Sequence, residues 1–245
     1  MEIICAAAQK GGVGKTTTAT ALAEAAAYKG KRALAIDLDA GNLSFALAAD
    51  RATGTTYDLL KGTPAADLIQ HTGIDGLDVI PAGLDNTTIK GTRGSANRLK
   101  DALQPIKRKY DYVFVDTPAG AGELQYNGLA AADLLIIPVL CEVFSVQTLY
   151  QFAGIIQELQ QINTKLKAAA IVANFDRRTT IAKQMRESIS DALQELNIIN
   201  AGAVRTCSKT GEAIALQRSL YEYAPSCKSA ADYLNVFSIV EQITK

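Results

Sequence analysis

Residues 9–17 of this 245-residue chain read Gln-Lys-Gly-Gly-Val-Gly-Lys-Thr-Thr. An apolar, strand-like stretch (residues 2–8) precedes them, and an alanine-rich helical stretch (residues 15–29) follows. A strand, a glycine-rich turn and a helix in this order present backbone N–H groups to a phosphate at the helix N-terminus. The segment therefore predicts a phosphate-binding loop.

The residues of this loop match the groups that a nucleoside triphosphate needs. Its glycines allow the backbone to approach closely, and Lys15 is placed to reach the β- and γ-phosphates. The hydroxyl of Thr16 is placed to ligate Mg²⁺. We assign nucleotide binding to Gly11, Gly12, Val13, Gly14, Lys15, Thr16 and Thr17.

Lys10 is surplus to those tasks, because the ordinary pattern has glycine at the position of Gln9 and needs no lysine next to it. A solvated loop lysine is the simpler interpretation. The stretch resembles the deviant Walker A motif, Lys-Gly-Gly-x-Gly-Lys-Thr, of the ParA/MinD family of P-loop ATPases, in which the early lysine crosses a dimer interface. The resemblance implies ATP and Mg²⁺ as cofactors, a homodimer formed on ATP binding, and catalysis in which Lys10 completes the partner's site.

Composition suits a single domain, residues 1–245, and the family resemblance implies one without an N-terminal DNA-binding extension. The chain is 48% hydrophobic, and its 25 basic residues balance its 25 acidic ones, so nucleic-acid binding would require a local patch. Four separated cysteines predict neither a zinc site nor disulfides, as expected in a reducing cytoplasm. No apolar run approaches the ~18 residues of a membrane span.

Apolar runs of strand length alternate with longer helical patterns. The predicted strands are 2–8, 32–37, 77–81, 111–116, 133–139, 168–174 and 199–204. The clearest predicted helices are 15–29, 96–109, 145–162, 179–196 and 229–244. This alternation is typical of an α/β fold with a mainly parallel twisted sheet, here of about seven strands, helices on both faces, and ligands at the carboxyl ends of the strands.

Asp37 and Asp39 end the second predicted strand and, two residues apart, point to the same side. Carboxylates here are also common caps. The stretch resembles the family segment Asp-x-Asp-Pro-Gln-Gly-Asn, whose second aspartate is tied to hydrolysis. The resemblance implies that Asp39 positions the attacking water and that Asp37 supports the Mg²⁺ shell. Residues 39–42, Asp-Ala-Gly-Asn, lack the Pro-Gln pair and are one residue shorter.

A third carboxylate, Asp116, ends the apolar strand 111–116 in a Walker B arrangement. It is expected to hold Mg²⁺ through water, together with Thr16 and Asp37, because Mg²⁺ takes few protein ligands. Residues 119–122, Ala-Gly-Ala-Gly, then offer a flexible turn that we interpret as a sensor of nucleotide state.

Two further residues are candidates for contacts with the base. Asn174, at the end of a predicted strand, resembles the family asparagine that bonds the adenine edge, although a turn-forming asparagine is the simpler alternative. Arg205 lies in a segment that resembles the one that closes over the base.

A DNA-segregation ATPase needs basic residues that hold DNA phosphates. One candidate group comprises Lys90, Arg93, Arg98, Lys100, Lys107, Arg108 and Lys109. The other comprises Arg177, Arg178, Lys183, Arg205, Lys209, Arg218 and Lys228. Solvated surface charge is the alternative interpretation for both.

Other members of the superfamily fit less well. A membrane-positioning MinD-like ATPase, or one that positions a protein cluster, is the alternative, but the last predicted helix has no basic face. The cysteines do not follow the pattern of a cluster-bearing reductase, and a ligase-like relative would lack Lys10. A nonhydrolysing switch is another alternative, because the Asp39 loop is short.

The sequence therefore predicts a ParA-like partition ATPase, slow without its partner, cytoplasmic and nucleoid-associated. Its ATP-sandwich dimer is expected to bind nonspecific DNA and to be stimulated by a ParB-type centromere-binding protein, with no stable membrane anchor. His71, in a predicted polar loop, is assigned no role.

Overall fold

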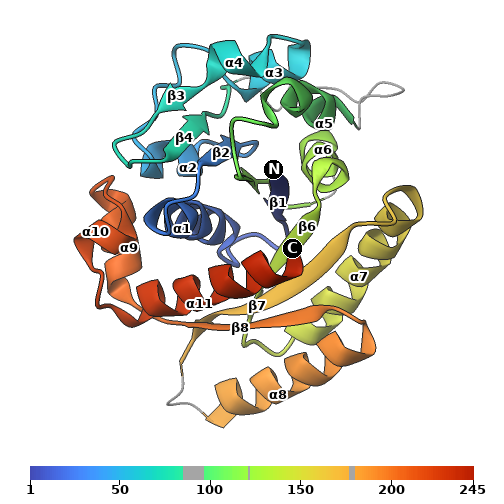
Figure 1. Ribbon diagram of the computed structural model, residues 1–245. Helices are drawn as coiled ribbons and strands as arrows, with labels where there is room; N and C mark the ends of the chain where they lie inside the picture. Colours follow the sequence, from blue (N-terminus) through green and yellow to red (C-terminus); the bar gives the residue numbers. More distant parts are fainter. Residues whose placement is uncertain (85–96, 121, 177–179) are drawn as a thin grey trace.

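The computed structural model describes residues 1–84, 97–120, 122–176 and 180–245. Its centre is an eight-stranded sheet in the order β3-β4-β2-β5-β1-β6-β7-β8, in which only β3 runs antiparallel to its neighbour (Figure 1). The strands are β1 (Glu2–Ala6), β2 (Ala33–Asp37), β3 (Gln70–His71), β4 (Leu77–Ile80), β5 (Tyr112–Asp116), β6 (Leu134–Leu140), β7 (Lys167–Phe175) and β8 (Ile199–Arg205).

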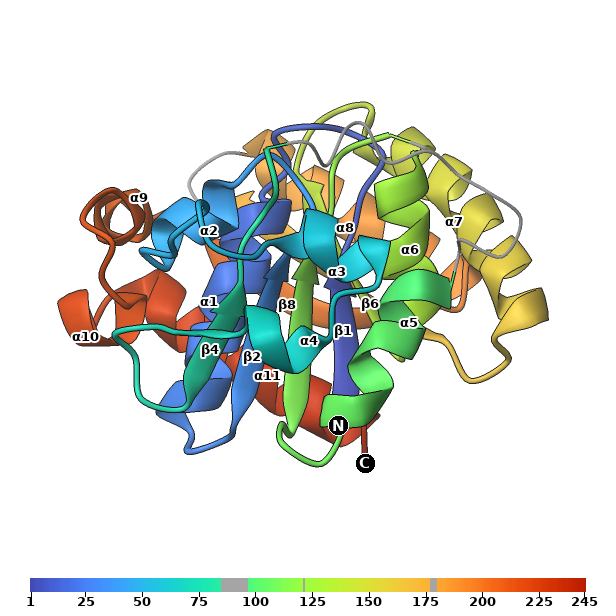
Figure 2. The ribbon, with the colours of Figure 1, turned by 90° about the horizontal axis from the view of Figure 1, so that it is seen from above.

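Helices cover both faces of this sheet (Figure 2). One face packs against α1 (Lys15–Tyr28), α2 (Asn42–Ala46), α9 (Ser208–Ala215), α10 (Leu220–Tyr223) and α11 (Lys228–Ile243). The other face packs against α3 (Thr56–Lys61), α4 (Ala65–Leu68), α5 (Arg98–Leu103) with the 3₁₀ turn η3 (Gln104–Ile106), α6 (Glu123–Ala131), α7 (Ser145–Ile162) and α8 (Thr180–Glu195).

Alternation along the strands explains why both faces are buried. In β1, Ile3 and Cys5 point into one core, whereas Ile4 and Ala6 point into the other. A strand buried on both faces reads as a continuous apolar run, which is what the sequence shows. The predicted α/β fold with a mainly parallel sheet is confirmed.

Helix α1 crosses the middle of the sheet and is buried on almost every side. Its alanines leave little side-chain bulk between the helix and its neighbours β5, β2 and α11. A helix that is apolar all round belongs in a core, and its small side chains allow close packing there. This packing fixes the N-terminus of α1 at the carboxyl edge of the sheet.

Parallel pairing brings the predicted site residues to that same edge. In register, Asp116 of β5 lies opposite Ala6 of β1 on one side and opposite Asp37 of β2 on the other. The phosphate-binding loop follows β1 directly, so it begins beside both carboxylates. The fold thus brings together the loop and two of the predicted acidic residues.

Three local predictions were wrong or incomplete. The two-residue strand β3 was missed, and His71, predicted in a loop, lies on it with its ring Nδ1 2.6 Å from Asp78 Oδ1. The predicted helix 96–109 is the shorter α5, followed by a 3₁₀ turn that contains Pro105. Proline lacks the backbone N–H that an α-helix interior requires, so it ends the α-helix there.

Within the described residues, no helix is both long and apolar enough to cross a membrane.

Glu24 of α1 is a buried carboxyl group outside the site. It accepts hydrogen bonds from the backbone N–H of Leu220 at 2.8 Å and from the hydroxyl of Ser219 at 3.4 Å. Burial raises the pKa of Glu24 from 4.5 to about 7, and these hydrogen bonds offset only part of that effect. The folded chain therefore holds this proton up to a higher pH than the unfolded chain does, so protonation of Glu24 stabilises the fold. This stabilisation is complete below the pKa of Glu24 in the unfolded chain and is lost as pH rises through its pKa in the folded chain.

We expect Glu24→Gln to remove this pH dependence. The free energy of unfolding of the variant, relative to the wild type, should rise by about 3 kcal/mol from acid to mildly alkaline pH. Urea unfolding at a series of pH values measures the difference. Glu222→Gln, which changes an exposed carboxylate of α10, is the matched control. A Glu24→Gln difference that stays constant with pH would contradict the assignment.

Candidate functional site

The phosphate-binding loop ends in a backbone conformation that requires glycine. Gly14, the N-cap of α1, has φ 95°, in the left-handed region that side chains disfavour. Lys15 follows as the first helical residue, and only 6% of it is exposed. The N-terminus of a buried helix with an adjacent lysine is suited to hold an anion.

Thr16 and Asp116 are joined directly at this edge. The Thr16 hydroxyl donates a hydrogen bond to Asp116 Oδ2 at 2.6 Å, whereas Asp116 Oδ1 is buried without a hydrogen-bond partner. The pKa of Asp116 is raised to about 8, mainly by burial and also by Asp37 and Asp39, while the Thr16 bond and Lys15 lower it. A buried carboxylate oxygen without a partner next to a hydroxyl fits a hydrated Mg²⁺.

The acidic residues nearby do not make a metal site by themselves. In the described part of the chain, no three His, Cys, Asp or Glu side chains are grouped so that they could hold a metal ion. Mg²⁺ usually binds one or two protein groups and takes its other ligands from phosphates and water. The Thr16 and Asp116 pair fits that pattern.

Asp37 is buried, and its carboxylate organises the loop that carries Asp39. Its Oδ1 accepts the backbone N–H of Asp39 at 3.0 Å, and its Oδ2 accepts the N–H and the hydroxyl of Ser44 at 2.9 and 2.7 Å. Burial raises the pKa of Asp37, and these hydrogen bonds lower it. These contacts show that Asp37 holds the loop in place, and its predicted support of the Mg²⁺ shell stays a prediction. Asp39 is half-buried at the loop surface.

The short Asp39 loop is closed by a second left-handed glycine. Gly41 has φ 100° and caps α2, and a Cβ atom there would lie 2.3 Å from a nitrogen of the Arg51 guanidinium. The Arg51 side chain donates to the carbonyl of Ala82 at 3.0 Å, so it is held in place against the loop. The Asp39 loop is thus a tight turn that is fixed by Gly41 and Arg51.

Lys10 lies at the exposed rim of the loop. Its Nζ lies 2.6 Å from Oε2 of Glu142, a residue that follows β6, and about half of each side chain is exposed. An exposed ion pair of this kind contributes only about 0–1 kcal/mol. Lys10 can therefore leave Glu142 at little cost when another anion approaches.

The residues predicted to contact the base lie further along the same edge. Asn174 is exposed and has φ 52°, a conformation that asparagine tolerates better than most residues, and its carbonyl accepts the hydroxyl of Thr206 at 2.9 Å. Arg205 instead pairs with Asp232 of α11 through Nε and Nη2, at 2.8 Å each. The contacts of Arg205 favour anchoring of α11 over direct binding of a base.

Sequence reasoning missed two residues that border the loop. It assigned no role to Glu142, the partner of Lys10. It also overlooked Gln125 of α6, a buried side chain that donates to the carbonyls of Ala8 at 3.2 Å and Pro118 at 3.3 Å. Gln125 thus ties the start of the loop to the segment after Asp116. Of the predicted sensor turn, Ala121 lies outside the described residues.

The comparisons with known proteins agree with this geometry. A family model described as an AAA domain matches residues 1–168. The chain is 40% identical over 197 residues to the chromosome partitioning protein ParA of Myxococcus xanthus, and the match covers 76% of this chain and 70% of the relative. It is 32% identical over 245 residues to the sporulation initiation inhibitor protein Soj of Bacillus subtilis, with 96% of each chain covered.

The chain belongs to the ParA/Soj family of partition ATPases. Among solved structures, the ATP complex of a Cyanothece McdA variant superposes with a TM-score of 0.87 at 21% identity, over 100% of this chain and 96% of that one. This likeness shows the shared fold.

Proposed function

We propose that this ParA/Soj family member hydrolyses ATP within a sandwich dimer, in which each subunit completes the other's site. The observation that carries the proposal is the placement of Lys10, exposed at the rim of an otherwise complete loop. Within one chain, Thr16 is hydrogen-bonded to Asp116 and Lys15 is buried at the start of α1, which supports their assignment to the nucleotide and its metal. A second lysine outside that set, held among the described residues only by an exposed ion pair with Glu142, can act on a neighbouring subunit.

The proposed roles of the individual residues follow from these positions. Bound Mg²⁺ would neutralise charge on the phosphates, with Thr16 and Asp116 as its protein groups. Lys15 holds the phosphates, and Asp39 orients the attacking water. Lys10 of the opposite subunit stabilises negative charge on the transferring group. Adenine contact is assigned to Asn174.

Exposed apolar residues support a dimer at this rim. Val143 and Phe144 directly follow Glu142 and are 70% and 71% exposed. Phe144 also lines an apolar groove that reaches Lys10 and Pro138. Burying such side chains against a second copy is favourable by about 25 cal/mol for each Å² of apolar area. The same surface would thus hold the subunits together and present Lys10 to the partner.

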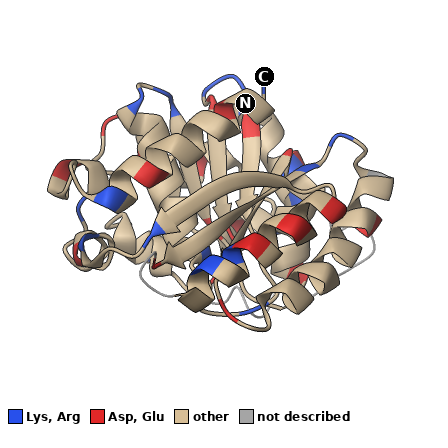
Figure 3. Ribbon diagram, turned by 90° about the horizontal axis from the view of Figure 1, so that it is seen from below, with Lys and Arg blue, Asp and Glu red and all other residues tan. Residues whose placement is uncertain are grey.

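Figure 3 shows where Lys and Arg residues lie on the fold, which allows a choice between the two candidate groups for DNA binding. Lys107, Arg108 and Lys109 immediately precede β5, so they lie at the amino edge of the sheet, opposite the loop. Lys183 and Lys228 are exposed near the starts of helices that follow the carboxyl edge. We assign the DNA contact to the described members of the second candidate group, which include Lys183 and Lys228. Their position near the carboxyl edge allows nucleotide binding to control the DNA contact.

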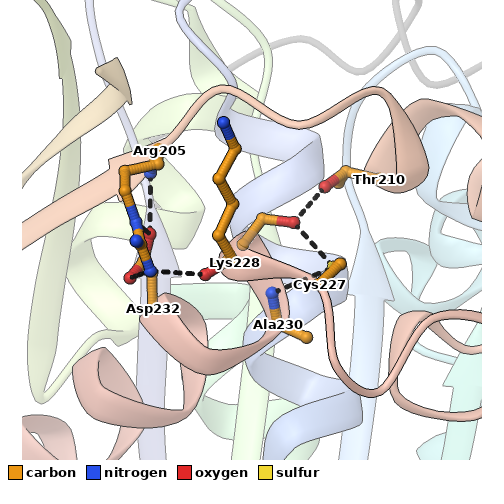
Figure 4. Close-up of polar contacts among 7 residues, drawn as sticks. Arg205, Thr210, Cys227, Lys228, Ala230 and Asp232 are labelled. Atoms are coloured by element: carbon orange, nitrogen blue, oxygen red, sulfur yellow. Dashed lines mark hydrogen bonds and ion pairs between the residues drawn. The ribbon is translucent and has the colours of Figure 1, made fainter. Parts of the chain in front are cut away.

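Ion pairs with acidic neighbours partly neutralise the positive charge of other residues in that group. The ion pairs are Arg205 with Asp232 (Figure 4), Lys209 with Glu212, and Arg218 with Glu222. DNA affinity should therefore be modest in one subunit and rise on dimerisation, which doubles the number of phosphate contacts. Of the predicted basic residues, Lys90, Arg93, Arg177 and Arg178 lie outside the described part of the chain.

A retention experiment tests the proposed function. Immobilised nonspecific DNA and anionic liposomes are each incubated with the protein, with and without ATP, over a series of salt concentrations. We expect retention on DNA that requires ATP and weakens steeply with salt. A ParB-type partner should then increase phosphate release. Retention on liposomes instead of DNA would contradict the proposal and favour a MinD-like activity.

Asp116→Asn should weaken Mg²⁺-dependent ATP binding by about 10- to 100-fold, because the substitution keeps the shape but removes the charge next to Thr16. Calorimetric titration with ATP, in the presence of Mg²⁺ and then of a chelator, measures the effect. Asp101→Asn, an exposed change in α5, is the control. Equal losses with and without Mg²⁺ would show that Asp116 does not act through the metal.

A further inference from the structure

Gln125 of α6 is a buried polar side chain that bonds two segments of the site at once. Only 2% of the residue is exposed. Its Nε2 donates hydrogen bonds to the carbonyl oxygens of Ala8 at 3.2 Å and of Pro118 at 3.3 Å. The amide nitrogen carries two hydrogens, so a single side chain can serve both acceptors. We call this pair of hydrogen bonds the Gln125 clamp.

The clamp joins the start of the phosphate-binding loop to the segment that follows β5. Ala8 lies two residues before Lys10, and Pro118 lies two residues after the end of β5. The two segments also contact each other directly, because a Cβ atom on Gly11 would lie 3.9 Å from the Cβ atom of Ala119. A movement of one segment therefore affects the other through the clamp and through this contact.

The base of the clamp is fixed, because α6 packs closely on the strand ends. A Cβ atom on Gly128, one turn after Gln125, would lie 2.6 Å from Thr117 Cγ2 and 3.2 Å from Cys5 Sγ. The Thr117 hydroxyl in turn donates to the carbonyl of Ala6 at 2.9 Å, which joins the ends of β5 and β1. Gln125 thus extends from a helix that is held against both strands.

We propose that Gln125 is a positioning residue that aligns Lys10 with the segment after β5. This inference rests on the proposed function, in which Lys10 acts on the partner's phosphates. Lys10 is half-exposed, and its ion pair with Glu142 restrains it weakly, so the backbone position at Ala8 decides where its side chain can reach. The clamp sets that position from Pro118, and thus from the segment beside the proposed metal group Asp116.

Gln125→Met should lower kcat by about 10- to 100-fold, because a displacement of about 1 Å at a catalytic group can cost about that much. Methionine has a similar length but donates no hydrogen bond. ATP affinity should change by less than about threefold, since Lys15, Thr16 and Asp116 stay in place. Phosphate release over a range of ATP concentrations separates kcat from KM, and urea unfolding reports any separate loss of stability.

Two further variants make this test specific. Gln125→Glu keeps the side-chain length, but its carboxyl group donates at most one hydrogen bond, so kcat should again fall. The matched control is Gln160→Met, because Gln160 of α7 also donates to a carbonyl, that of Leu166 at 3.0 Å, but at the opposite edge of the sheet. Its kcat should equal that of the wild type. Wild-type kcat in Gln125→Met or in Gln125→Glu would overturn the proposal.

A double variant tests whether Gln125 acts through Lys10. If it does, Lys10→Ala with Gln125→Met should release phosphate at the rate of Lys10→Ala alone, within about threefold. Single-turnover phosphate release with excess protein measures these slow rates. A double variant slowed by the product of the two single effects would overturn the link. Wild-type turnover in Lys10→Ala alone would instead contradict the proposed function.

Discussion

Replacing Lys10 by alanine is expected to reduce ATP turnover at least about 100-fold while ATP still binds. ATP binding should persist because Lys15, Thr16 and Asp116 remain in place within the same subunit. Turnover should fall because no other cation would stabilise the transferring phosphoryl group from across the dimer. Phosphate release and nucleotide titration, carried out on the same preparation, measure the two effects separately.

Lys165→Ala provides the control for the Lys10 variant, since it removes an exposed lysine that follows α7 and precedes β7, at the opposite edge of the sheet. Its turnover should match that of the wild type. The ion pair with Glu142 is exposed, so its loss should change the free energy of unfolding by less than about 1 kcal/mol. Unchanged turnover in Lys10→Ala would contradict a catalytic role for this residue.

Replacing Asp39 by alanine should trap the ATP-bound dimer. Without the carboxylate that orients water, hydrolysis should slow by about 100-fold or more, whereas the loop, held by Asp37 and Ser44, should keep its shape. Sedimentation at saturating ATP is expected to show a dimer that persists long after the wild-type protein has returned to monomers. Phosphate release gives the corresponding rate.

The control for Asp39 is Asp191→Ala, which removes an exposed carboxylate from α8. This variant should form and lose its dimer at the wild-type rate. A monomeric Asp39→Ala variant at saturating ATP would count against the assignment. Wild-type turnover in the Asp39→Ala variant would show that a group other than Asp39 positions the attacking water.

The parallel sheet and the phosphate-binding loop could be predicted because each depends on a continuous stretch of sequence. Strands such as β5 are apolar runs that end in a carboxylate, and parallel pairing necessarily brings those ends to one edge. Asp37 and Asp116 could therefore be predicted as neighbours without knowledge of the fold in detail. The short β3 could not be predicted, because Gln70 is held there by contacts with Asp50 and Thr53, seventeen or more residues away.

The partners of the site residues were harder to predict than the residues themselves. The sequence identified Lys10 and Arg205, but it did not indicate that Glu142 and Asp232 would pair with them. These pairs join residues 132 and 27 positions apart, so they depend on how β6 pairs beside β1 and on how α11 packs onto the sheet. The end of β6 beside β1 was the available clue for Glu142, because residues after neighbouring parallel strands meet at one edge.

The central claim, that Lys10 acts on the partner's site, is tested most directly by mixing two inactive variants. Lys10→Ala and Asp39→Ala are combined in equal amounts before ATP is added. In a mixed dimer, the subunit with alanine at position 10 keeps its own Asp39 and receives Lys10 from the other subunit, so one of its two sites is complete. We predict that mixing restores phosphate release to about a quarter of the wild-type rate, since about half of randomly formed dimers are mixed. A mixture no more active than the sum of the separate variants would contradict action of Lys10 across the dimer.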